Sequence, residues 1–112
     1  MTDAELDAYR LRLLAELQAL AEQASASKDA RSTVTLDQQA VGRLSRMDAL
    51  QQQAMAQATE RRRQGEARAI RAALSRIDGG EFGYCHDCGE AIAAERLAAK
   101  PTIRLCMSCA RG

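Results

Sequence analysis

Four cysteines are the residues of this 112-residue chain whose type and spacing point most directly to chemistry. They form two CxxC pairs that are separated by 17 residues. Two residues between cysteines let one tight turn direct both sulfurs at a single ion, and a second pair completes a tetrahedron with Zn–S distances of about 2.3 Å. The spacing therefore predicts one zinc ion bound by Cys85, Cys88, Cys106 and Cys109.

The donor set also predicts the role of the metal. Four sulfur ligands leave no open position for water, and a closed site of this kind is structural, so we expect no enzyme activity. Gly89 follows the second cysteine and can take a positive φ, which lets backbone N–H groups point at sulfur. His86 is the only histidine and could replace a cysteine as a ligand, but because it lies inside the first turn we expect it to be exposed and without a role.

Disulfides and thiol redox chemistry are the alternatives for the cysteines. Residues 1–10 are acidic without an apolar run, and no stretch approaches the roughly 20 apolar residues that span a membrane. We therefore expect a cytoplasmic protein without membrane association, in a compartment where clustered cysteines bind metal. Thiol oxidoreductases commonly place one CxxC on a βαβ fold, a pattern that is missing here, but a redox sensor using the pairs stays an alternative hypothesis.

Two long helices are predicted before the cysteines. The first spans residues 2–25, where Thr2 and Glu5 have the pattern of a capping box. An apolar stripe at spacings of three and four indicates one buried face, made of Leu6, Tyr9, Leu13, Leu17, Leu20 and Ala24. The small, polar residues 25–34 are typical of a turn.

The second helix is predicted to begin at Thr35 and to run to Ile77, where Asp78-Gly79-Gly80 is a stop signal. Such a length, about 60 Å at 1.5 Å per residue, is typical of a coiled coil. Its apolar positions fall into two stripes of different phase. The first contains Val41, Leu44, Met47 or Asp48, Met55 and Ala58, and we expect it to pack on the first helix. The second contains Ala67, Ile70, Leu74 and Ile77, and we expect it to face the zinc module.

The predicted fold is therefore mostly α. A long antiparallel helical hairpin occupies residues 1–80, with its tip near 25–35, and a small four-cysteine zinc finger occupies residues 81–112. With no tryptophan, one phenylalanine and two tyrosines, the chain cannot bury a large core, which makes a metal staple more important. We expect the finger to form a small core from Phe82, Tyr84, Ile92, Leu97, Ile103 and Leu105.

The finger motif supports a family resemblance. It reads Phe82-Gly83-Tyr84-Cys85-x-x-Cys88-Gly89-x-x-Ile92, then Arg96-Leu97-x-Ala99-x-Pro101, then Cys106-x-x-Cys109. This stretch resembles the zinc finger of the DksA/TraR family, and the predicted hairpin is similar to that family in architecture. The resemblance implies a bacterial transcription regulator that binds RNA polymerase directly rather than DNA, entering the secondary channel with the hairpin, in some members together with guanosine tetraphosphate.

The predicted tip departs from the best-known members of that family, which carry Asp-x-x-Asp-x-Ala there. Residues 25–42 contain Asp29 and Asp37 but not this motif, and with Lys28 and Arg31 their net charge is −2 + 2 = 0. We expect a neutral tip to exert a weaker electrostatic effect than a doubly acidic one.

A zinc ribbon that binds nucleic acid through the arginine-rich second helix is the other function that the residues allow. The formal net charge is +1, and four zinc-bound thiolates would make it −1, whereas phosphate contacts demand a basic surplus. No aromatic residues that could stack on bases are interspersed among these arginines. We therefore expect no direct, specific contacts with DNA, and the resemblance implies a protein partner instead. We also expect the protein to be a monomer.

Overall fold

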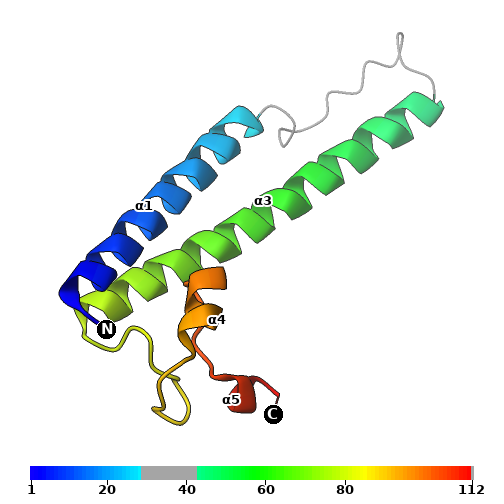
Figure 1. Ribbon diagram of the computed structural model, residues 1–112. Helices are drawn as coiled ribbons and strands as arrows, with labels where there is room; N and C mark the ends of the chain where they lie inside the picture. The colour runs from blue at the N-terminus through cyan, green and yellow to red at the C-terminus, as the bar shows by residue number, and fades with distance from the viewer. Residues whose placement is uncertain (29–42, 112) are drawn as a thin grey trace. The chain divides into compact units, whose positions relative to one another are not determined.

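The computed structural model describes residues 1–28 and 43–111, without the side chains of residues 43 and 44. The described residues form four helices, α1 (Asp3–Ala26), α3 (Arg43–Asp78), α4 (Ala94–Ala99) and α5 (Met107–Ala110), and one isolated antiparallel bridge between Tyr84 and Ala91 (Figure 1). The predicted fold class is confirmed: two long helices precede a small four-cysteine module in a mostly α chain. The predicted beginning of the second helix at Thr35 and most of the predicted tip lie outside the described residues.

The chain divides into two compact units. The first unit contains Met1–Gln18 and Ala67–Gly112, and the second contains Ala19–Glu66. Each unit therefore holds one segment of α1 and one segment of α3. The boundary predicted at residue 80 falls inside the first unit and stays a prediction.

Local signals set the ends of the helices as predicted. At the start of α1, Glu5 N–H donates to Thr2 Oγ1 at 3.2 Å and Thr2 N–H donates to Glu5 Oε1 at 3.5 Å, which is a capping box. At the end of α3, Gly80 has a φ of 75°, its N–H donates to Ile77 O, and Glu81 N–H donates to Arg76 O at 2.9 Å. This pair of bonds is a Schellman motif, which requires a residue with positive φ and so favours glycine.

The predicted stripe on α1 is the face that the structure buries. Leu13 is 0% exposed, and the other members of the stripe are half-buried. The second predicted stripe of α3 is confirmed as well: Ile70 and Ile77 are buried, while Ala67 and Leu74 are half-buried. Together with residues of the finger, these side chains form the core of the first unit.

The first predicted stripe of α3 is wrong. Met47 and Met55 are 56% and 63% exposed, Ala58 is half-buried, and Val41 and the side chain of Leu44 are not described. The less exposed residues of α3 instead continue the phase of Ala67 and Ile70 backwards along the helix, at spacings of three and four, through Arg46, Ala49, Gln53, Ala56, Glu60 and Arg63. The helix keeps one phase because a regular helix presents one face to its neighbour, whatever residue types occupy it.

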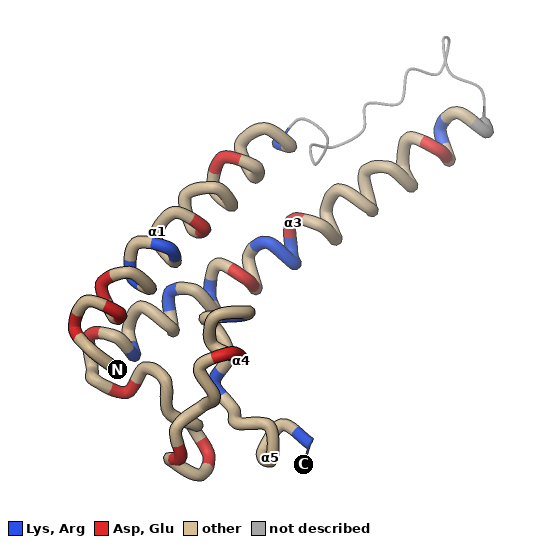
Figure 2. The backbone as a smooth tube through the Cα atoms, viewed as in Figure 1, with Lys and Arg blue, Asp and Glu red and all other residues tan. Residues whose placement is uncertain are grey.

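Acidic and basic residues are distributed unevenly along the two long helices. Figure 2 shows acidic residues near the start of α1 and basic residues repeated along α3. Within the first unit, an ion pair joins Arg10 of α1 to Asp78 of α3 at 2.6 Å. The side chains of Arg10 and Asp78 are 40% and 64% exposed, so solvent screens this pair and it contributes only about 0–1 kcal/mol. None of the described helices is long and apolar enough to cross a membrane.

Leu13 should be the residue of α1 on which the first unit depends most. We predict that Leu13→Ala lowers the free energy of unfolding by about 2–5 kcal/mol, because it leaves a cavity where the side chain is fully buried. Leu11→Ala is the matched control, since Leu11 is 69% exposed and its truncation leaves no cavity. Urea unfolding followed by circular dichroism measures both; equal losses would contradict the packing described.

Candidate metal centre

The first cysteine pair lies in a tight backbone turn. The bridge between Tyr84 and Ala91 brings the chain back on itself, and Cys85 N–H donates to Glu90 O at 2.7 Å. Gly89, with a φ of 76°, closes the turn by donating its N–H to Cys85 O at 3.0 Å. A side chain at Gly89 would be strained by this left-handed backbone, which explains why glycine follows the CxxC pair.

The second pair lies at the start of α5. Cys106 is the N-cap residue, and Cys109 follows one turn later, with Ala110 N–H donating to Cys106 O at 2.9 Å. Residues three apart lie on the same side of a helical turn, so both sulfurs point the same way. His86 N–H donates to Arg104 O at 2.7 Å and ties the first turn to the segment before the second pair.

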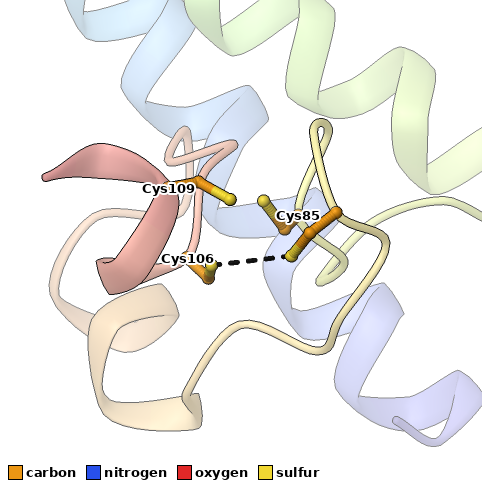
Figure 3. Close-up of side chains that lie close together, drawn as sticks. Cys85, Cys106 and Cys109 are labelled. Atoms are coloured by element: carbon orange, nitrogen blue, oxygen red, sulfur yellow. Dashed lines mark hydrogen bonds between the residues drawn. The ribbon is translucent and has the colours of Figure 1, made fainter. Parts of the chain in front are cut away.

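The structure brings together all four cysteines that the sequence predicts. Their sulfur atoms lie within 4.8 Å of one another, and Cys88 Sγ and Cys106 Sγ are 3.7 Å apart (Figure 3). A tetrahedron with Zn–S distances of about 2.3 Å has edges of about 3.8 Å, so the donor set fits a zinc ion. The four cysteines are free thiols, at separations well above the roughly 2.05 Å of a disulfide bond.

The pKa values of the clustered cysteines show how neighbouring groups favour or disfavour their ionisation. Nearby backbone N–H groups, those of Cys106 and Cys88 first, lower the pKa of Cys85 to about 6. Neighbouring thiols, with that of Cys106 first, raise the pKa of Cys109. One thiolate is therefore favoured in the cluster and further thiolates are disfavoured by their neighbours. A divalent cation reverses this balance, because it stabilises all four as thiolates and releases their protons.

His86 does not belong to the cluster. Its side chain is exposed, as predicted, and the group of metal-ligating residues contains the four cysteines alone among the described residues. Cys85 is buried, Cys106 and Cys109 are half-buried, and Cys88 is exposed. The site is thus backed by the core of the finger on one side and open to solvent on the other.

The finger packs as predicted except at one position. Phe82, Ile92 and Leu97 are buried, and Ile103 and Leu105 are half-buried. Tyr84 is 51% exposed, which corrects its predicted place in the core. In extended backbone, neighbouring residues point to opposite sides, so the inward position of Cys85 turns Tyr84 outward.

Contacts that sequence reasoning missed attach the finger to the helices within the first unit. Arg12 of α1 donates to Ala98 O at 2.7 Å, and Arg76 of α3 donates to Thr102 O at 3.3 Å. The rings of Tyr9 and Phe82 pack with centroids 5.2 Å apart. The packing of Tyr9 and Phe82 could have been suspected from the sequence, because the chain has few aromatic residues. No sequence pattern predicts that an arginine donates a hydrogen bond to a backbone carbonyl far along the chain.

Comparison with known proteins agrees with this site. Residues 80–112 match the family described as the prokaryotic DksA/TraR C4-type zinc finger, so zinc is the metal of a finger of this type. Over 40 residues the chain is 50% identical to the RNA polymerase-binding transcription factor DksA of Haemophilus influenzae and 42% identical to that of Escherichia coli K12. These alignments cover 36% of this chain but only 28% and 26% of the two relatives.

A solved structure matches nearly the whole chain. The transcription factor DksA2 from Pseudomonas aeruginosa superposes with a TM-score of 0.81, over 99% of this chain and 84% of that one. The sequence identity is 24%, so this likeness establishes the fold alone.

We predict that the purified protein contains one zinc per chain and that its affinity for zinc falls as the pH is lowered, because protons compete for the thiolates. Metal analysis combined with thiol titration tests this. Cys88→Ser should lose most of the metal, whereas His86→Ala should keep it. A folded, zinc-free protein with four titratable thiols would falsify the assignment.

Zinc removal should also weaken the helices of the first unit. The finger contributes Phe82, Ile92 and Leu97 to the buried residues of the first unit, which also include Leu13 and Ile77, so we expect loss of its fold to expose apolar surface on both helices. We predict that a chelator lowers the melting temperature of the helical signal in the wild type and that Cys88→Ser has the same effect without a chelator. If residues 81–112 unfolded while helical melting stayed unchanged, the finger would be an independent domain.

Proposed function

We propose that this chain, a DksA-like member of the prokaryotic DksA/TraR family, regulates transcription by binding bacterial RNA polymerase through its helical pair, without binding DNA directly. The observation that carries the proposal is the combination of two matches. Over 40 residues the chain is similar in sequence to factors named for polymerase binding, and over nearly its whole length it shares the fold of a protein named as a transcription factor. A finger alone would leave the function of the helices open.

In this proposal Cys85, Cys88, Cys106 and Cys109 bind one structural zinc ion. Two observations support this: the four sulfur atoms lie within 4.8 Å of one another, and a tight turn holds each pair of cysteines. The metal takes no part in chemistry, because all four positions around it are filled by sulfur. Its role is to hold the small finger folded against the ends of the long helices, which then present their surface to the partner.

Charge and contacts favour a protein partner over nucleic acid. The formal net charge is only +1, and zinc-bound thiolates lower it further. Two arginines of α3 are engaged within the protein, Arg63 with Ser27 and Glu60, and Arg76 with Thr102 O. Such arginines position the fold rather than neutralise phosphates.

The predicted tip residues Asp29, Arg31 and Asp37 lie outside the described residues, so their contribution rests on composition. We propose that a tip of zero net charge occupies the same polymerase channel as an acidic tip but perturbs the catalytic centre less.

Polymerase binding is tested by adding the zinc-loaded protein to purified RNA polymerase. We predict co-elution on size exclusion and competition with an acidic-tip DksA for the same site. At equal occupancy, transcription from a sensitive promoter should change less than with the acidic-tip protein. The absence of competition would contradict channel binding, whereas equal potency would contradict only the role of tip charge. Salt-dependent retention on DNA would favour the nucleic-acid alternative.

A further inference from the structure

The second unit is held together by a different chemistry from the first. Every buried apolar side chain that the structure describes belongs to the first unit, and the buried residue described in the second is Glu60, which is 8% exposed. In the part of α3 that belongs to the second unit, the less exposed positions include Arg46, Gln53 and Arg63. Little apolar surface is therefore removed from water where the two helix segments of the second unit meet.

Polar contacts occupy part of that face, beside the half-buried Leu20, Ala24, Ala49 and Ala56. Arg63 Nη1 donates to Ser27 Oγ at 2.8 Å and lies 3.4 Å from Glu60 Oε2, and Ser27 Oγ donates to Ala24 O at 3.3 Å. The side chains of Arg63 and Glu60 are only 22% and 11% exposed. Because Arg63 can meet Ser27 in only one alignment of the two helix segments, the contact specifies their register.

Large apolar side chains of the same α3 segment face outward. Met47, Leu50 and Met55 are 56%, 47% and 63% exposed. Packing these side chains on α1 would add apolar burial, and the structure does not use them for that purpose. The pairing of the two helix segments in the second unit is therefore specific, but it contributes less to stability than the core around Leu13 and Ile77.

We propose that the second unit opens independently of the first, and that the contacts among Ser27, Arg63 and Glu60 form a polar latch that closes it in a single register. Segments with few buried apolar contacts have the lowest free energy of local opening. A partner that binds only the closed helix pair would stabilise the latch, and through it the second unit, by mass action. The proposal rests on burial and contacts alone and stands whether or not polymerase is that partner.

Hydrogen exchange on the zinc-loaded full chain tests this opening. We expect amides of residues 45–60 to exchange at least about tenfold faster than those of residues 68–78, although both segments belong to one helix. Equal protection along α3 would overturn the proposal, because the two units would then open as one.

Substitutions test the latch itself. Arg63→Leu removes the cation beside a buried carboxylate, so exchange of residues 45–60 should rise by roughly a further tenfold while residues 68–78 are unchanged. Arg61→Leu is the matched control, because Arg61 is an exposed neighbour on the same helix, and it should change neither segment. The double variant Glu60→Leu/Arg63→Leu should recover wild-type protection, since an apolar pair of similar size replaces the ion pair. If the double variant stayed as open as Arg63→Leu, or the control opened equally, the latch would be refuted.

Discussion

Four thiols gathered within 4.8 Å are the constraint on which the first unit depends. Backbone N–H groups favour a thiolate at Cys85, while the other sulfurs disfavour further negative charge, as at Cys109. A zinc ion bound by the four sulfurs, as proposed, would stabilise all four thiolates and link two turns that are far apart in sequence. Short helices such as α4 and α5 have little stability of their own and remain folded because this link and the shared core hold them.

The rest of the molecule follows from how apolar residues are distributed. With few aromatic residues, the chain concentrates its apolar burial in the first unit, which contains the buried residues Leu13, Ile70, Ile77, Phe82 and Leu97. The distal end of the helix pair is aligned by polar contacts and keeps its methionines outside. The same two helices thus carry most of the apolar burial in the first unit and the proposed local opening in the second.

The sequence was sufficient for features that arise locally. Cysteine spacing predicted the cluster, the Thr2–Glu5 pair predicted the start of α1, and Asp78-Gly79-Gly80 predicted the end of α3, because each depends on a few neighbouring residues. The zinc finger and the mostly α fold could therefore be predicted from the sequence. The predicted tip gave no such check, since its central residues are not described.

Features set by tertiary packing could not be predicted in this way. Met47 and Met55 appeared to mark a buried stripe, but the register fixed farther along by Ile70 and Ile77 turned them outward and placed Glu60 inside. Tyr84 was assigned to the core because it is aromatic, although alternation beside Cys85 exposes it. Apolar character predicts burial only when the register of the element is already known.

The central claim is that one zinc ion, bound by four cysteine sulfurs, links the two turns of the finger. X-ray absorption at the zinc edge measures the ligands of the metal directly. The structure predicts a single shell of four sulfurs at about 2.3 Å, unchanged in His86→Ala. A mixed shell with a nitrogen or oxygen ligand near 2.0–2.1 Å, about the Zn–N distance of histidine, would contradict the account, because the site would then be neither closed nor built from the four cysteines alone.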